Sequence, residues 1–293
     1  MKIGIIGAGA VGMIFGAYLA EAKHDIVLFV RKETENLYIE KVPNNPELIK
    51  CKQVIEIESL FSMDLIIIAV KYHHLEKLKS ELDLLPKHIP LLFLQNGLLH
   101  LSFANQLKQE TIMIGSVLHG ATKVTPSTVR HLGVGKTSVG VYKGVWEKSD
   151  EFFGSSSDDF PLIYTNHIET TLFKKALMNC LINPLTTITK APNGMLIKND
   201  SYRMIMKNMY EELMDVFDEW NEMLLWEEVV ELCKNTENNR SSMLSDYENN
   251  RIMEIDTIVG AILVEAKKRN EVLPILNTFY LLLKEMNKVG DRH

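Results

Sequence analysis

The stretch Ile3–Gly12 reads IGIIGAGAVG, and it decides the fold of the first half of the chain. Its β-branched start predicts a buried strand, and the residues from Met13 to Leu19 continue with helical spacing. Between strand and helix, three glycines follow the spacing GxGxxG. In this order of elements a helix N-terminus presents backbone N–H groups to a diphosphate. We therefore expect a dinucleotide site here, and a glycine turn kept only for packing is the alternative.

Each glycine of this loop has its own expected role. Gly7 makes the tight turn, Gly9 lets the backbone approach a diphosphate, and Gly12 lets the helix pack closely on the strand. The expected cofactor-binding loop comprises Gly7, Ala8, Gly9, Ala10, Val11 and Gly12.

Further apolar runs predict the rest of an α/β fold. Runs that predict strands are Asp25–Val30, Leu65–Val70, Leu91–Leu94 and Thr111–Ile114. They alternate with helical stretches to about residue 120, and Val124–Tyr142 predicts an antiparallel hairpin added to the same sheet. Helical periodicity follows in Thr170–Thr187, Ser201–Leu232 and Met253–Arg269. We expect a Rossmann-type, doubly wound α/β sheet in residues 1–166 and an all-α domain in residues 167–293.

Composition fits an ordinary two-domain globular protein. The 293 residues are 46% apolar and carry a net charge of −6. No basic patch suggests a nucleic-acid partner, and no apolar run is long enough for a membrane span or typical of an export signal. The three cysteines lack the spacing of a metal site, so we expect reduced thiols, no metal and a cytoplasmic location.

Arg31 and Lys32 follow the second predicted strand, where NAD-preferring sites place an acidic residue. A guanidinium there favours the 2′-phosphate of NADP(H), while a solvated basic pair is the alternative. Lys71, directly after the third strand, is a second cation at the carboxyl edge of the sheet. It is expected to bind either the phosphate or the substrate.

A polar stripe marks the helix predicted after residue 170. Lys175, Asn179 and Asn183 recur at every fourth position, so they lie on one helix face among apolar neighbours. Reduction of a ketone by a nicotinamide needs a proton donor, and a lysine can fill that role. A hydrogen-bonded core stripe is the alternative.

With these residues in place, the sequence resembles the ketopantoate reductase (2-dehydropantoate 2-reductase) family, which reduces ketopantoate to (R)-pantoate with NADPH in pantothenate and coenzyme A biosynthesis. Four motifs carry the resemblance: GAGAVG from Gly7, Gln95–Gly97, KxxxNCLINPLT from Lys175, and Ser241–Leu244 with Glu254–Asp256. By resemblance, Lys175 is the general acid that protonates the C2 alkoxide, and Glu254 is the acid that contacts the substrate hydroxyl and helps to place the lysine.

The resemblance also implies the remaining site residues. Asn179, Asn183 and Ser242 would hold the hydroxyl and carboxylate of the substrate, with Asn239 as a further candidate. Asn96 would lie between nicotinamide and substrate and so contact both. Arg31 matches the arginine for the 2′-phosphate, and Lys71 matches a lysine of the cofactor cleft.

Two departures from the family leave the substrate open. Phe173 stands where many members have Trp, and Gly115–Gly120 replaces a Gly-Thr-Thr run. His119 and His131 lie nearby in the sequence and are expected to be structural. Another 2-oxo acid, or NADP(H) sensing without turnover, therefore remains an alternative. Amphipathic helices can face a second subunit and the family contains monomers and dimers, so both states stay open, with a homodimer favoured.

Overall fold

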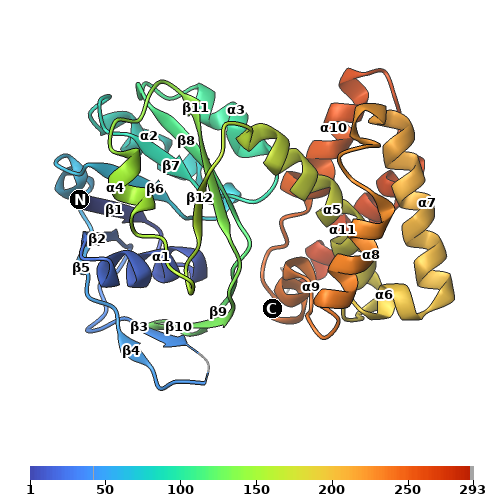
Figure 1. The fold of residues 1–293 in the computed structure, drawn as a ribbon, viewed down its shortest axis with the longest axis horizontal. Coiled ribbons are helices and arrows are strands. Elements are labelled where there is room, and N and C mark those ends of the chain that lie inside the picture. Colours follow the sequence, from blue (N-terminus) through green and yellow to red (C-terminus); the bar gives the residue numbers. More distant parts are fainter. Residues whose placement is uncertain (42, 291–293) are drawn as a thin grey trace. The chain divides into compact units, whose positions relative to one another are not determined.

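The computed structural model describes residues 1–41 and 43–290, which form two compact units (Figure 1). The first unit comprises Met1–Gln95 and His100–Thr171, and the second comprises Asn96–Leu99 and the chain from Leu172 onward. Helix α5 (Ile168–Thr189) begins in the first unit and ends in the second. No helix among the described residues is long and apolar enough to span a bilayer.

The first unit is built on an eight-stranded sheet in the order β12-β11-β8-β7-β6-β1-β2-β5. Its strands are β1 (Lys2–Ile6), β2 (Asp25–Phe29), β5 (Lys52–Val54), β6 (Leu65–Ile68), β7 (Leu91–Phe93), β8 (Ile112–Val117), β11 (Thr137–Lys143) and β12 (Leu162–Tyr164). The strands from β5 to β8 are parallel, whereas β11 pairs antiparallel with β8. The strand order reverses at β1, which is where open α/β sheets bind ligands.

The central strands are apolar throughout because both sheet faces are covered. Every residue of β6 and β7 is buried, which matches the unalternating sequences LIII and LLF. Helix α1 (Ala10–Glu21) packs against β1 and β2, and also against the strands of a smaller sheet (Figure 1). Helices α2 (Lys79–Leu84), α3 (Leu99–Asn105) and α4 (Ser149–Phe153) complete the connections. The predicted α/β class of this half is confirmed.

The predicted hairpin lies in a second, smaller sheet. Strands β9 (Gly120–Thr125) and β10 (Thr128–Gly133) do form an antiparallel hairpin, but they pair with β3 (Tyr38–Lys41) and β4 (Glu47–Leu48) rather than with the main sheet. Only β11 joins the main sheet from this region. The hairpin leaves the main sheet because its inward face, with Val129 buried at its centre, packs on α1. The prediction that the hairpin extends the main sheet was therefore wrong.

Two histidines and a tyrosine form a hydrogen-bonded chain between α1 and this smaller sheet. The Tyr18 hydroxyl lies 2.8 Å from His131 Nδ1, and His131 Nε2 lies 3.1 Å from His119 Nδ1. His119 Nδ1 also accepts from the N–H of Gly135, so this nitrogen carries no proton. Burial lowers the pKa of His119 to about 4. Both histidines are therefore neutral hydrogen-bonding members of the first unit near pH 7.

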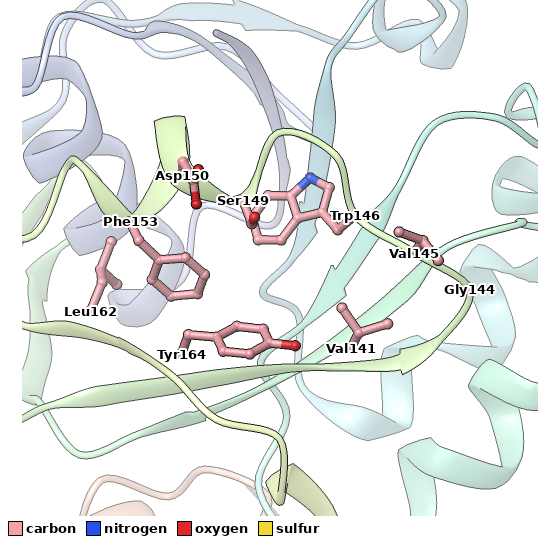
Figure 2. A pocket seen from close by; sticks show the side chains of 9 residues that line it. All are labelled: Val141, Gly144, Val145, Trp146, Ser149, Asp150, Phe153, Leu162 and Tyr164. Atoms are coloured by element: carbon pink, nitrogen blue, oxygen red, sulfur yellow. The ribbon is translucent and has the colours of Figure 1, made fainter.

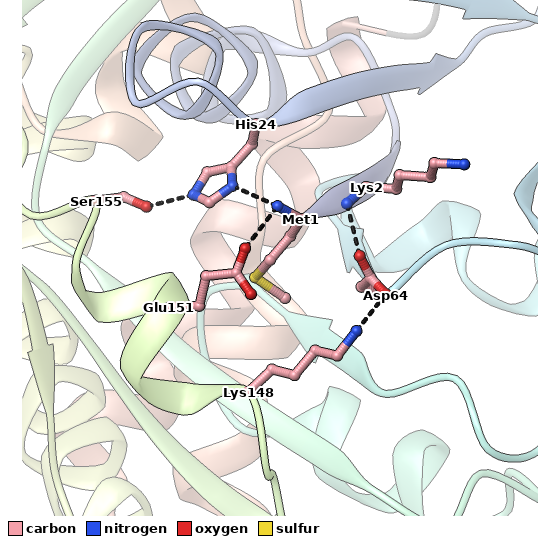
Figure 3. A network of polar contacts seen from close by, with 7 residues as sticks. All are labelled: Met1, Lys2, His24, Asp64, Lys148, Glu151 and Ser155. Carbon is pink, nitrogen blue, oxygen red and sulfur yellow. Dashed lines mark hydrogen bonds and ion pairs between the residues drawn. The ribbon is translucent and has the colours of Figure 1, made fainter.

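A second polar network fixes the beginning of β1 (Figure 3). The amino group of Met1 donates to Glu151 Oε1 at 2.8 Å and lies 3.0 Å from His24 Nδ1. Because Nδ1 accepts from an ammonium, the proton of His24 lies on Nε2, which contacts Ser155 Oγ at 2.6 Å. Burial and the adjacent ammonium lower the pKa of His24. This network joins β1, the end of α1 and the segment around α4.

The second unit is helical. Besides most of α5, it contains α6 (Met195–Lys198), α7 (Asp200–Val216), α8 (Trp226–Asn235), α9 (Ser242–Glu248), a π-helical segment (Asp256–Gly260), α10 (Ala261–Lys268) and α11 (Pro274–Gly290). The predicted helix Ser201–Leu232 is interrupted, because the chain turns at residues 217–225 between α7 and α8. The buried side chains of Phe217, Trp220 and Leu224 make this turn part of the core. Its apolar residues explain why sequence periodicity did not reveal the break.

Candidate functional site

The glycine loop between β1 and α1 leaves room for a ligand at one of its three glycines. Gly7 has φ +109°, and a Cβ there would lie 2.7 Å from Val70 Cγ1. A Cβ on Gly12 would lie 2.0 Å from the carbonyl oxygen of Gly7. Both glycines are therefore required by the fold itself. For Gly9 the nearest atom to a Cβ is the carbonyl oxygen of Ala69, 3.8 Å away, so the protein leaves this space open.

Helix α1 points its N-terminus at this loop. Gly9 is the N-cap residue and provides no side-chain cap. The first turn of a helix has N–H groups without intrahelical acceptors and a positive electrostatic potential. Ala10 and Val11 open this turn, and their side chains pack against the apolar core. The open space at Gly9 and the uncapped turn fit a diphosphate.

Arg31 and Lys71 lie beyond the carboxyl ends of β2 and β6, the two strands that flank β1. Arg31 Nη2 lies 3.3 Å from His74 Nδ1, so the 3-10 turn Tyr72–His74 reaches the end of β2. Lys71 is the N-cap residue of that turn and is half-buried. Burial lowers the pKa of His74, and the nearby cations add to this effect. The edge beside the glycine loop is therefore rich in positive charge.

Three predicted residues meet in the second unit. Lys175 Nζ on α5 donates to Asn96 Oδ1 at 3.0 Å, and Asn96 Nδ2 donates to Glu254 Oε2 at 3.2 Å. These two bonds fix the orientation of the Asn96 amide, because its oxygen faces the ammonium and its nitrogen faces the carboxylate. Lys175 and Glu254 lie 79 and 158 residues beyond Asn96 in the sequence, so the fold brings three distant segments together.

Burial lowers the pKa of Lys175 to about 8, and the Glu254 carboxylate opposes this shift. Removing an ammonium from water disfavours its charged form, whereas a nearby negative charge favours it. The ammonium therefore releases its proton more readily than that of an exposed lysine. A lysine with this property is suited to general acid chemistry near neutral pH.

The backbone of the second unit holds Asn96 in place. Gly97 has φ +74°, and a Cβ there would lie 1.8 Å from the carbonyl oxygen of Thr257. The N–H of Leu98 donates to that same carbonyl at 3.2 Å. Thr257 belongs to the π-helical segment that begins two residues after Glu254. One backbone contact thus connects the segments that carry Asn96 and Glu254, and only glycine allows it.

Gln95 plays a structural role that the sequence did not indicate. Its Nε2 donates to the carbonyl oxygens of Ile68 and Val70 at 3.0 and 2.9 Å. The side chain thus fixes the chain from the end of β6 at Ile68 to Val70, the residue before Lys71. Its buried Oε1 has no hydrogen-bond partner among the described residues.

The two asparagines of the predicted stripe follow Lys175 on α5. Asn179 is half-buried, and Asn183 is only 4% exposed. The Nδ2 atom of Asn183 is buried without a hydrogen-bond partner in the described structure. A buried amide of this kind is costly unless something else accepts its hydrogen bonds. Asn183 is therefore a good candidate for ligand binding.

Ser242 and Asn239 are exposed, and no described contact joins either to Lys175. Ser242 opens α9, but the N-cap is Ser241, whose Oγ accepts from the N–H of Leu244 at 3.1 Å. Ser241 Oγ also lies 2.8 Å from Thr186 Oγ1 on α5. This bond holds the start of α9 against the helix that carries Lys175 and Asn183.

Asn193 is a buried polar residue that was not among the predicted site residues. Its Nδ2 donates to Thr236 Oγ1 at 2.9 Å, while its Oδ1 has no partner among the described residues. Its backbone N–H donates to the carbonyl of Asn239. The only signal was an asparagine in a Pro-Asn-Gly turn, which turn chemistry explains without a ligand.

Phe173, one departure from the family pattern, packs in the second unit. Its ring stacks on Trp220 at 4.9 Å and meets Phe217 edge-on at 5.3 Å between centroids. The other departure begins at Gly115 in β8, where a Cβ would lie 2.5 Å from Leu94 Cδ2. Packing thus explains Phe173 and the glycine at position 115.

A surface hollow of about 610 Å³ lies elsewhere in the first unit (Figure 2). Its lining includes Trp146, Phe153 and Tyr164, on or beside β12 and α4. The predicted site residues are absent from its described lining. In the described parts of the chain no group of three or more His, Cys, Asp or Glu residues is arranged to hold a metal ion.

Comparison with known proteins assigns both halves of the chain to one family. Residues 3–144 match the family model of ketopantoate reductase PanE/ApbA, and residues 167–287 match the model of its C-terminal region. The 2-dehydropantoate 2-reductase of Listeria monocytogenes is 33% identical over 299 residues, covering 99% of this chain and 98% of the relative.

Similar solved structures support the same family assignment. A crystal structure of the probable 2-dehydropantoate 2-reductase of Bacillus subtilis has a TM-score of 0.86 at 30% identity, with 98% of this chain and 100% of that chain covered. D-mandelate dehydrogenase, solved with NADH and anilino(oxo)acetate, has a TM-score of 0.85 at 25% identity over 99% of this chain and 100% of that one. The chain belongs to the ketopantoate reductase family.

Proposed function

We propose that this protein reduces 2-dehydropantoate (ketopantoate) to (R)-pantoate with NADPH, as a cytoplasmic enzyme of pantothenate biosynthesis. The observation that carries the proposal is the hydrogen-bonded set of Lys175, Asn96 and Glu254, in which burial lowers the pKa of Lys175. The curated relatives named 2-dehydropantoate 2-reductase support this choice of substrate.

Lys175 is the proposed general acid. NADPH, when bound, supplies the hydride for the C2 carbon. The Lys175 ammonium stabilises the negative charge that develops on the C2 oxygen and then donates its proton to that oxygen. Asn96 holds the ammonium by its Oδ1, and Glu254 keeps the Asn96 amide oriented. Glu254 is also proposed to accept from the substrate hydroxyl.

Uncharged side chains are proposed to orient the substrate. Asn179 and Asn183 lie one and two turns beyond Lys175 on α5, so they extend the site away from the proton donor. The buried amide of Asn183 supports this role, since a substrate oxygen would satisfy its Nδ2. Ser242 and Asn239 are proposed to hold the hydroxyl and carboxylate from the α9 side.

Residues 1–166 are proposed to bind the cofactor, and residues 167–293 to carry most of the substrate site. The glycine loop from Gly7 to Gly12 would hold the diphosphate. Arg31 and Lys71 would bind the 2′-phosphate, and their place beside β1 supports this assignment. NADP(H) is therefore the proposed cofactor, and Arg31→Ala should raise the Kd of NADPH far more than that of NADH.

Substitution of Lys175 tests the mechanism. Lys175→Ala should lower kcat/KM for ketopantoate by about 10²–10⁴-fold while the Kd of NADPH stays unchanged. The matched control is Lys174→Ala, because Lys174 is the neighbouring lysine but pairs with Glu228 at 2.9 Å. Near wild-type turnover in Lys175→Ala would disprove the general-acid assignment.

A different 2-oxo acid is the second candidate substrate. The structural likeness to D-mandelate dehydrogenase, solved with an aryl-substituted oxo acid analogue, favours testing it. Ranking ketopantoate, phenylglyoxylate and branched 2-oxo acids by kcat/KM with NADPH distinguishes the two. NADPH binding without oxidation by any of them would favour a sensor instead.

A further inference from the structure

One lysine outside the predicted site contacts the glycine loop directly. Lys123 Nζ on β9 donates to the carbonyl oxygen of Ala8 at 3.0 Å. Ala8 lies between Gly7 and Gly9, and its loop precedes the first turn of α1. The ammonium of Lys123 is thus held at the residue that directly precedes Gly9.

The register of the smaller sheet explains how Lys123 reaches the loop. Lys123 lies opposite Val129 on β10, and the neighbouring pair on the same face is Ala121 and His131. Val129 and His131 are buried against the first-unit core, and β9 and β10 both pack on α1. This face of β9 therefore follows α1, and its lysine extends toward the N-terminal end of that helix.

The charge of Lys123 is not neutralised by the protein. Its hydrogen-bond acceptor is an uncharged carbonyl, and no carboxylate among the described residues pairs with it. Lys123 is an exposed residue, and partial desolvation of its ammonium lowers its pKa. It also lies near the positive end of α1. Two positive groups at the glycine loop favour an anion there.

We infer that Lys123 binds the diphosphate of the dinucleotide. The flexible lysine stem lets Nζ exchange the Ala8 carbonyl for a phosphate oxygen, with which it forms a charge-assisted hydrogen bond. Arg31 is proposed to read the 2′-phosphate that only NADP(H) carries, whereas Lys123 contacts a group that NADPH and NADH share. The identity of the ligand rests on the proposed function; the role of Lys123 is tested without turnover.

Equilibrium binding of NADPH and of NADH, followed by nicotinamide fluorescence with no 2-oxo acid present, tests this role. Lys123→Met should raise the Kd of both dinucleotides by the same factor, about tenfold. Lys123→Gln keeps a donor for the Ala8 carbonyl but removes the charge, so it should weaken binding nearly as much. A purely structural lysine would be replaced by Gln without loss.

Lys143→Met is the matched control. Lys143 is also an exposed strand lysine in the first unit, and its Nζ donates to the carbonyl of Leu107 at 3.3 Å, away from the glycine loop. This variant should leave both Kd values unchanged. Thermal unfolding of each unliganded variant verifies that the first unit is folded.

The outcomes separate this inference from the proposed function. Kd values within twofold of wild type for both dinucleotides in folded Lys123→Met or Lys123→Gln would overturn the role of Lys123. Weakening of NADPH alone would also overturn it, because that result assigns Lys123 to the 2′-phosphate. Dinucleotide binding that depends on Lys123, without reduction of ketopantoate, would disprove the proposed reaction and leave the inference standing.

Discussion

The glycine loop and the lysine site are constructed in opposite ways. The loop is local: the residues from Gly7 to Gly12 form a candidate binding surface from backbone, in which Gly7 and Gly12 are sterically required and Gly9 leaves room for a ligand. The lysine site joins the side chains of Asn96, Lys175 and Glu254 from three distant segments. A local backbone site is encoded by spacing, whereas an assembled side-chain site depends on packing throughout its unit.

Two alanine substitutions in the loop should have the largest effects on stability and on dinucleotide binding. Gly12→Ala places a Cβ 2.0 Å from the Gly7 carbonyl oxygen, so it should lower the Tm by about 10 °C and abolish dinucleotide binding. Gly9→Ala meets no atom closer than 3.8 Å, so it should leave the Tm unchanged and raise the Kd of NADPH about tenfold or more. Equal effects of the two variants on Tm would contradict separate roles for these glycines.

Gly97→Ala extends the test to the assembled site. The new Cβ would lie 1.8 Å from the Thr257 carbonyl oxygen, which forces the Asn96 segment away from the π-helical segment. We expect kcat to fall about 100-fold because Asn96 no longer holds Lys175, while the Kd of NADPH changes little. Gly133→Ala is the control, since no atom lies within 4 Å of its Cβ. Unchanged kcat in Gly97→Ala would show that Asn96 does not need this backbone contact.

The pH dependence of kcat gives a smaller and more specific effect. In the proposed mechanism reduction needs the Lys175 ammonium, so activity should be present below its pKa of about 8 and decline as the pH rises through that value. Glu254 raises this pKa, so Glu254→Gln should move the decline to lower pH. Asp256→Asn is the control, because it also removes a negative charge from this segment. The Asp256 carboxylate pairs with Lys284, so the pH profile of this variant should match that of the wild type. A shift to higher pH in Glu254→Gln would contradict the coupling.

The sequence predicted the local site better than the assembled one. The strand, loop and helix from Ile3 onward lie as expected because short-range sterics determine them. Strands β3, β4 and β5 were not predicted, since they are two to four residues long and largely polar or exposed. Neither spacing nor periodicity could show that the hairpin of β9 and β10 prefers a separate sheet, because that choice depends on packing against α1.

For the lysine site, the sequence predicted which residues take part but not the hydrogen bonds between them. Periodicity placed Lys175, Asn179 and Asn183 on one helix face, and the family resemblance added Asn96 and Glu254. The bonds that join Asn96 to both partners depend on side-chain orientation, which no sequence pattern encodes. Lys123 was not singled out, because a lysine in a polar strand is ordinary until its contact with Ala8 is known.

The membership of Asn96–Leu99 in the second unit has a consequence for dissecting the protein. These four residues are flanked on both sides by first-unit chain, so the chain passes between the units three times. A fragment beginning near residue 167 would contain Lys175 and Glu254 but not the amide that joins them, and its Thr257 carbonyl would lose Leu98. The second unit is therefore not a contiguous gene segment, and exchanging it between relatives requires moving this four-residue insert with it.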